Sequence, residues 1–215
     1  MRAEVKAWAK KFKDGNKWNV WQGVLVVSVI SGIVSGVIGA VFPGPTPEEP
    51  STTAATLESI AGIAMLPMTI GLIVYMVNLI RGKKFDINQI FSKYGEFVRI
   101  FLVSLLEGII VTLFTFLLII PGIIRALAYT LVQYILADDD FKDLGTKEVL
   151  DLSKEIMDGH KMDLFLMNLG YFLMLILGCF TLGILWIWTI PEMTLANAKY
   201  ATDLLDEYKK NNKKK

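Results

Sequence analysis

Residues 20–42 read VWQGVLVVSVISGIVSGVIGAVF, a stretch of 23 residues without one charged side chain. As an α-helix with a rise of about 1.5 Å per residue, this stretch extends about 34 Å, enough to cross the hydrocarbon core of a bilayer. The apolar core of a secretory signal is shorter, about 7–15 residues, and no small-residue cleavage site follows this stretch. The sequence therefore predicts a membrane-spanning helix here and not a cleaved leader.

The composition of the whole chain agrees with a membrane protein. Its 215 residues are 53% hydrophobic and 20% charged, with a mean hydropathy of +0.49. A typical soluble domain is about 45–50% apolar and about 25% charged. The net charge of +1 gives no basic excess for binding nucleic acid, and the single Cys179 excludes an intramolecular disulfide.

Five further apolar segments follow, so the predicted fold class is all-α, a polytopic membrane bundle of six transmembrane helices. The segment before them, residues 1–19, is predicted to be a basic amphipathic helix in the cytoplasm. Residues 201–215 are predicted to be a basic, solvated cytoplasmic tail, and residues 20–200 are predicted to form the membrane domain. The predicted spans are residues 20–42, 60–80, 97–120, 123–137, 164–180 and 182–198.

The distribution of Lys and Arg predicts that both termini lie in the cytoplasm, because cytoplasmic loops collect these residues. The predicted external loop 43–59 contains neither, and only Arg125 falls in the outer half of a span. A four-span alternative makes 123–137 re-entrant and fuses 164–190 into one helix. That alternative would place the four lysines of residues 138–163 outside the cell, so six spans are favoured.

Two segments are predicted to form amphipathic helices on the cytoplasmic surface of the membrane. Residues 1–18 place Val5, Trp8 and Phe12 at helical spacing among lysines. Residues 146–159 place apolar side chains on one helical face in the same way. Such a pattern is typical of a helix that lies in the plane of the membrane surface.

Small residues occur at every fourth position on one face of the first predicted span. They are Ser28, Gly32, Gly36 and Ala40. Small residues at this spacing allow two helix backbones to approach closely within lipid. The face is interpreted either as packing within the protein's own bundle or as docking of a foreign helix or a second copy of the chain.

Ionisable side chains within predicted spans are candidate functional residues, because they are expensive to place in lipid. Glu107, Arg125 and Glu192 are of this kind, and Asn168 and Asn197 are polar companions. Counted along the predicted spans, Arg125 reaches Glu192 more readily than Glu107. These residues are interpreted either as a proton or cation pathway or as a structural polar lock.

The sequence predicts no catalytic residues, no metal and no cofactor. Asp138, Asp139, Asp140 and Asp143 cluster beyond the fourth predicted span without the spacing of a calcium loop, and are expected to form a solvated acidic boundary. One histidine, His160, and one cysteine are too few for a typical zinc site. Neither a phosphate-binding glycine loop nor a strained nucleophile turn is present.

Several stretches resemble a bacterial integral membrane family, domain of unknown function 975. They are LIIPGII at 118–124, YILAD at 134–138, LSKEIMDGHK at 152–161 and DLF at 163–165. The resemblance runs from Lys10 to the sixth predicted span and departs at Met162, where the family usually has tryptophan. It implies a multi-pass helical protein similar to the membrane part of certain glycerophosphodiester phosphodiesterases. Some members are linked to protection against bacteriocins.

These observations predict a non-catalytic protein of the bacterial plasma membrane. The leading hypothesis is immunity, in which the chain binds a membrane-active toxin or bacteriocin through the face of Ser28, Gly32, Gly36 and Ala40. The alternatives are a small transporter or channel that uses Glu107, Arg125 and Glu192, and a factor for membrane-protein assembly. The predicted partners are the lipid bilayer, the toxin and a second copy of the chain, with no nucleic acid.

Overall fold

The computed structural model describes residues 2–44, 51–83, 86–181 and 183–212. Within these ranges the chain is helical and contains no strand, so the all-α class is confirmed. The elements are α1 (Arg2–Gly15), α2 (Lys17–Val41), α3 (Thr52–Ala64), α4 (Leu66–Ile80), the 3-10 helix η1 (Ile87–Glu96), α5 (Phe97–Leu117), α6 (Ile119–Ala128), α7 (Val132–Ala137), the 3-10 helix η2 (Asp139–Phe141), α8 (Thr146–Ile156), α9 (Lys161–Phe180) and α10 (Ile184–Asn212).

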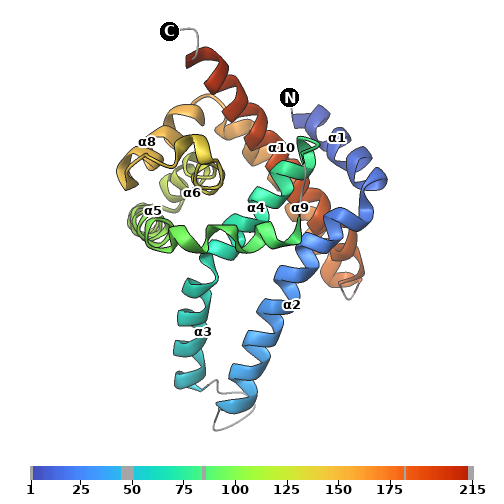
Figure 1. The fold of residues 1–215 in the computed structure, drawn as a ribbon, viewed down its shortest axis with the longest axis vertical. Coiled ribbons are helices and arrows are strands. Elements are labelled where there is room, and N and C mark those ends of the chain that lie inside the picture. The colour runs from blue at the N-terminus through green and yellow to red at the C-terminus, as the bar shows by residue number, and fades with distance from the viewer. Residues whose placement is uncertain (1, 45–50, 84–85, 182, 213–215) are drawn as a thin grey trace.

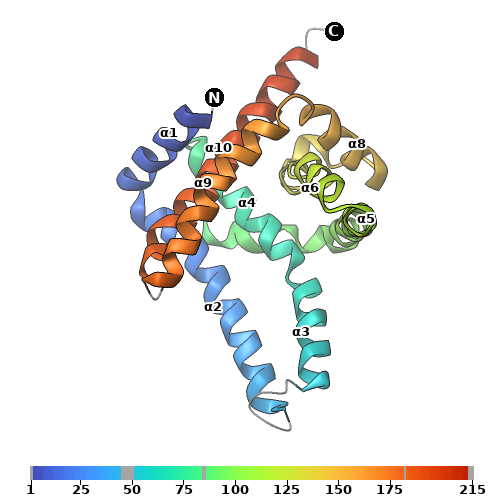
Figure 2. The same cartoon turned by 180° about the vertical axis from the view of Figure 1, so that it is seen from behind.

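The long helices form hairpins, α2 with α3, α5 with α6 and α9 with α10. These hairpins extend in different directions from the centre of the molecule. The α2–α3 pair projects away from the rest of the molecule, whereas α5 is seen nearly end-on in the same view (Figure 1). The view from behind shows α9 and α10 side by side, crossing the upper part of the molecule at a slant (Figure 2). The hairpins therefore splay apart and do not form one parallel bundle.

The described residues contain four helices that are long and apolar enough to cross a membrane. They are α2, the continuous Ile87–Leu117, Ile119–Ala137 and α9, and the α3–α4 pair, bent by 40°, gives a fifth if it is one span. Residues 184–198 of the sixth predicted span lie in the first half of α10, where Glu192, Asn197 and Lys199 interrupt the apolar run, and residue 182 lies outside the described residues. Six spans are therefore not confirmed, and the described residues contain up to five candidates.

The turn between α9 and α10 contradicts a single helix over residues 164–190. Helix α9 ends at Phe180, and Gly183 has a φ of 85° before α10 begins at Ile184. A positive φ of this size favours glycine, which has no Cβ to clash with the backbone. The hairpin predicted from Gly178 and Gly183 is thus confirmed in its geometry.

The buried core lies where α4, η1, α7, α8 and the second half of α10 meet. These are mostly the less apolar segments of the chain, and they bury one face each. The largest fully buried side chains belong to Met68, Ile70, Tyr75, Met76, Ile90, Ile100, Leu131, Ile135, Leu136, Met157, Leu164 and Tyr200.

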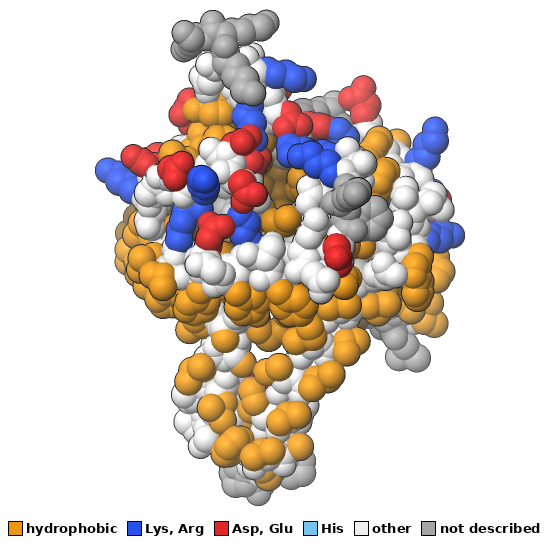
Figure 3. Space-filling model, in the orientation of Figure 1, with side chains coloured by type: hydrophobic (Ala, Val, Ile, Leu, Met, Phe, Trp, Pro, Cys, Tyr) orange, Lys and Arg blue, Asp and Glu red, His pale blue; other side chains and the backbone are white. Residues whose placement is uncertain are grey.

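The long apolar helices α2 and α5, by contrast, leave most of their surface uncovered. Every residue in the most apolar 18-residue stretch of α2 is at least partly exposed, and Phe116 at the end of α5 is 88% exposed. Hydrophobic side chains form a band beneath the charged region and continue along the α2–α3 hairpin (Figure 3). A soluble protein rarely exposes apolar patches of this extent, so lipid covers this surface and the chain is a membrane protein.

The two predicted surface helices form, but protein covers their apolar faces. Val5 and Ala9 of α1 are buried where this helix packs on α9 and α10. Helix α8 buries Val149, Leu152 and Ile156 beside α5 and α7. An amphipathic pattern shows that one face is buried, and it does not show whether lipid or protein buries it.

Candidate functional site

The first candidate site is an ion pair between the N-terminal helix and the last helix. The Lys13 ammonium of α1 donates a hydrogen bond to the Glu192 carboxylate of α10 at 2.7 Å, and their side chains are only 11% and 21% exposed. Glu192 follows Pro191, and proline removes one hydrogen bond from the preceding helical turn. The carbonyl of Trp188 in that turn accepts a second hydrogen bond from Lys13 at 3.3 Å.

A second lysine of α1 lies beside this pair. The Lys6 ammonium sits 4.4 Å from the centre of the Tyr171 ring on α9, a cation–π contact. Gly170 makes room for it, because a Cβ at that position would lie 2.4 Å from the Lys6 ammonium nitrogen. Burial lowers the pKa of Lys6, and the nearby Glu192 carboxylate opposes that shift. Helix α1 is therefore held to α9 and α10 by two lysines.

Two predicted polar companions lie on the same pair of helices. Asn168 is on α9 and Asn197 is on α10, and the side-chain carbonyl oxygen of each is buried without a hydrogen-bond partner in the described part of the chain. The amide nitrogen of Asn197 donates to the carbonyl of Met193 at 3.0 Å. The structure therefore brings three of the five predicted polar residues, Glu192, Asn168 and Asn197, to the α9–α10 hairpin.

The other two, Glu107 and Arg125, lie on the α5–α6 hairpin. The Arg125 guanidinium stacks 4.4 Å from the centre of the Phe114 ring, and among the described residues no ion pair includes it. The structure does not pair Arg125 with Glu192, which the count along the predicted spans favoured, because Glu192 binds Lys13. Arg125 instead shares a surface hollow with Lys154 and Asp158, next to the segment predicted to be cytoplasmic.

The small-residue face of α2 is open. Ser28, Gly32, Gly36 and Ala40 are all exposed. A Cβ added to Gly32 or Gly36 would meet no described atom within 4 Å. The protein's own packing uses a different glycine of α2, because a Cβ at Gly23 would lie 2.8 Å from the Tyr75 ring.

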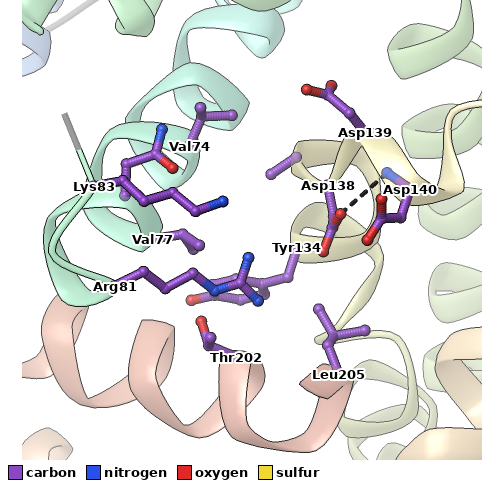
Figure 4. Close-up of a pocket in the computed structure, with 12 residues that line it drawn as sticks. Val74, Val77, Arg81, Lys83, Tyr134, Asp138, Asp139, Asp140, Thr202 and Leu205 are labelled. Atoms are coloured by element: carbon purple, nitrogen blue, oxygen red, sulfur yellow. Dashed lines mark hydrogen bonds between the residues drawn. The ribbon is translucent and has the colours of Figure 1, made fainter. Parts of the chain in front are cut away.

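The acidic cluster after α7 lines one side of a pocket (Figure 4) and is bound to lysines, and Asp139 and Asp140 are also largely exposed to solvent, as predicted. The Lys209 ammonium of α10 hydrogen-bonds Asp138 at 2.6 Å and also Asp140, while Lys93 of η1 hydrogen-bonds Asp139 at 2.7 Å. Burial lowers the pKa of Lys209, but its hydrogen bonds with Asp138 and Asp140 raise that pKa by more. In the part of the chain that the structure describes, no three potential ligands gather into a metal site.

These ion pairs also correct the prediction for the C-terminal segment. Residues 201–215 were predicted to be a solvated tail, but α10 continues to Asn212 and packs Tyr200, Leu204 and Leu205 into the core. The sequence contains a signal for this packing, because small and apolar residues recur at helical spacing from Leu195 onward. The many charged residues at the end of the segment make this apolar spacing difficult to recognise from the sequence.

Comparison with known proteins finds a family that matches one part of the chain. Residues 116–207 match the family described as "Protein of unknown function (DUF975)". This match confirms the predicted resemblance over a range that begins at the end of α5 and includes α6, α7, α8, α9 and most of α10. No curated protein and no solved structure matches the chain.

Proposed function

We propose that this chain, whose residues 116–207 match a family without an assigned activity, is a non-catalytic multi-pass protein of the bacterial plasma membrane that binds a membrane-inserted polypeptide. In its most specific form the proposal is immunity, with a bacteriocin or another membrane-active toxin as the partner. The observation that supports it is the open face of Ser28, Gly32, Gly36 and Ala40 on α2.

The physical argument concerns how helices associate in lipid. Lipid tails are as apolar as leucine, so close packing of backbones at small residues drives helix association. The α2–α3 hairpin projects from the molecule, which leaves this face accessible from the surrounding bilayer (Figure 1). A partner helix, or a second copy of the chain, can therefore approach Gly32 and Gly36 without displacing any described part of the protein.

Leucine at Gly32 or Gly36 should abolish partner binding and leave the fold intact. We expect cross-linking to the partner in cells of the native species to fall at least about 10-fold, because a bulky side chain separates the two backbones. The thermal midpoint of the purified protein should stay within a few degrees of the wild-type value, since each site is open. The readouts are mass spectrometry of the cross-linked partner and, for immunity, survival under the toxin.

Gly62→Leu supplies the matched control on α3 of the same hairpin. A Cβ at Gly62 also meets no described atom within 4 Å, so its steric freedom equals that of Gly32. Equal loss of the partner in all three variants would contradict docking on the small-residue face. Recovery of a membrane-insertion component in place of a toxin would favour the assembly-factor alternative, which uses the same surface.

The proposed orientation places both termini in the cytoplasm and the α9–α10 turn outside. Cys179 is exposed at this turn, so an impermeant thiol reagent should label it in intact cells. In a Cys179→Ser background, a cysteine at the exposed Lys142 should react only after permeabilisation. The reverse pattern, with Cys179 protected and position 142 labelled, would require the opposite orientation.

The transporter alternative uses Glu107, Arg125 and Glu192. Its residues lie on two separate hairpins, and Glu192 is engaged by Lys13. Ion flux in proteoliposomes tests it directly: a pathway through these carboxylates requires that Glu107→Gln and Glu192→Gln each abolish the flux.

A further inference from the structure

Helix α5 lies crosswise to α2. The α2–α3 hairpin extends down the view of Figure 1, whereas α5 is seen nearly end-on, and the view from behind agrees (Figure 2). Transmembrane helices tilt by about 0–40° from the membrane normal, so two crosswise helices cannot both span one bilayer. Of the two, α2 is the better span, because its most apolar stretch contains no buried residue and residues 20–42 contain no charge.

Only one side of α5 is open to lipid. Val98, Leu105 and Leu113 are exposed and recur at about every second turn, so they form one stripe along the helix. On the opposite side, Ile100 and Val103 are fully buried by the rest of the protein. A helix with one apolar exposed stripe and one covered side has the pattern of a helix in the plane of a membrane surface.

The charged helix α8 packs beside α5 and follows its direction. Near the start of both helices, Arg99 of α5 and Thr146 of α8 line one surface hollow. Farther along, Lys154 of α8 lines a second hollow with Arg125, whose guanidinium stacks on Phe114 of α5. The outer face of α8 exposes Lys147, Glu148, Asp151 and Glu155. If α5 crossed the bilayer, this face would enter the hydrocarbon, where charged side chains are costly.

The turn between α5 and α6 is apolar and lies close to the second hollow. Its five consecutive exposed side chains are Phe116, Leu117, Leu118, Ile119 and Ile120. Turns in water are rich in polar residues and glycine, so this run indicates contact with lipid. Helix α6 begins at Ile119 and reaches Arg125 after six residues, which is about 9 Å. This distance is far shorter than the hydrocarbon core of about 30 Å.

We propose that the α5–α6 hairpin does not cross the bilayer and instead lies in the single leaflet that faces α8. The acyl chains of that leaflet contact the stripe of Val98, Leu105 and Leu113 and the turn 116–120. Arg125 lies at the boundary with water, where a long cationic side chain places its charge. The candidate spans Ile87–Leu117 and Ile119–Ala137 are then one hairpin that enters and leaves on the same side. This inference does not use the small-residue face of α2, so it stands or falls separately from the proposed function.

Depth measurements with single nitroxide labels test this arrangement. The full-length protein in phospholipid vesicles, in a Cys179→Ser background, receives one cysteine at Val98, Leu105 or Leu113. Electron paramagnetic resonance compares the access of oxygen with that of a water-soluble nickel complex. An in-plane helix gives three similar depths, whereas a spanning helix places Leu105 about 10 Å deeper than Val98, which is seven residues away. All three positions are exposed, so the labels should not disturb the fold.

The matched control uses exposed positions of α2. Trp18, Val29 and Val41 should give a deep centre between two shallow ends, as expected for a true span. A label at Leu118, in the turn, should be protected from the nickel complex, because it lies among acyl chains. The proposal is overturned if α5 gives the same deep centre as α2, or if the label at Leu118 reacts with the nickel complex as a water-exposed site does.

Discussion

Gly71→Ala should destabilise the centre of the protein by about 3 kcal/mol, because α4 and η1 touch there backbone to backbone. A Cβ on Gly71 would lie 2.0 Å from the carbonyl oxygen of Ile90 and 2.5 Å from its carbonyl carbon. A flexible side chain could rotate away from such a contact, but a backbone carbonyl moves only with its helix. Thermal unfolding of the detergent-purified variant, followed by circular dichroism, should show a midpoint lowered by several degrees.

Gly62→Ala is the matched control for this change. It lies on α3, the other arm of the same bent helix pair, and the added Cβ meets no described atom within 4 Å. Alanine is the better helix former by about 1 kcal/mol, so Gly62→Ala should be neutral or slightly stabilising. Equal midpoints for the two variants would show that α4 and η1 do not approach as closely as the structure indicates.

The long apolar helices could be predicted from the sequence, and their arrangement could not. The uncharged run from Val20 to Phe42 corresponds to α2, which the structure extends back to Lys17. Hydropathy indicates that a segment avoids water, but it does not state whether lipid or protein covers it. The apolar α2 helix is left exposed, whereas the apolar α4 is buried in the core together with the less apolar α8 and the end of α10.

The break within the second predicted span has a local cause that the sequence does contain. Pro67 lies in the first turn of α4, where its missing N–H is tolerated, and α3 ends just before it at Ala64. A proline inside an apolar run can kink one helix or separate two, and only the structure shows the 40° bend. The span 60–80 is thus two helices and not one.

Individual residues of the candidate site could be predicted from the sequence, but the contacts between them could not. Glu192 stands out as a carboxylate in an apolar run, while Lys13 is one of several lysines in a basic N-terminal segment. The count along the spans gave a depth for Arg125 but not its neighbours, and the structure places its guanidinium over the Phe114 ring. Contacts between residues far apart in the chain come from the packing of the helices, for which a single sequence contains no direct signal.

The second large effect concerns the Lys13–Glu192 pair, which anchors α1 to α10. Lys13→Met and Glu192→Gln should each lower the free energy of unfolding by about 3 kcal/mol, because each leaves one charge shielded from water without its partner. The double variant should lose less than the sum of the two, since no unpaired charge remains and the methionine stem retains the packing of the lysine stem. Chemical denaturation of the four proteins gives this coupling energy directly.

Lys10→Met is the control, because Lys10 is an exposed lysine of the same helix. It should leave stability within about 0.5 kcal/mol of the wild-type value. Limited proteolysis should also release α1 earlier in Lys13→Met and Glu192→Gln than in Lys10→Met, since only the first two break the Lys13–Glu192 ion pair. Additive losses in the double variant would mean that Lys13 and Glu192 stabilise the protein independently, and α1 would then be held mainly by Val5 and Ala9.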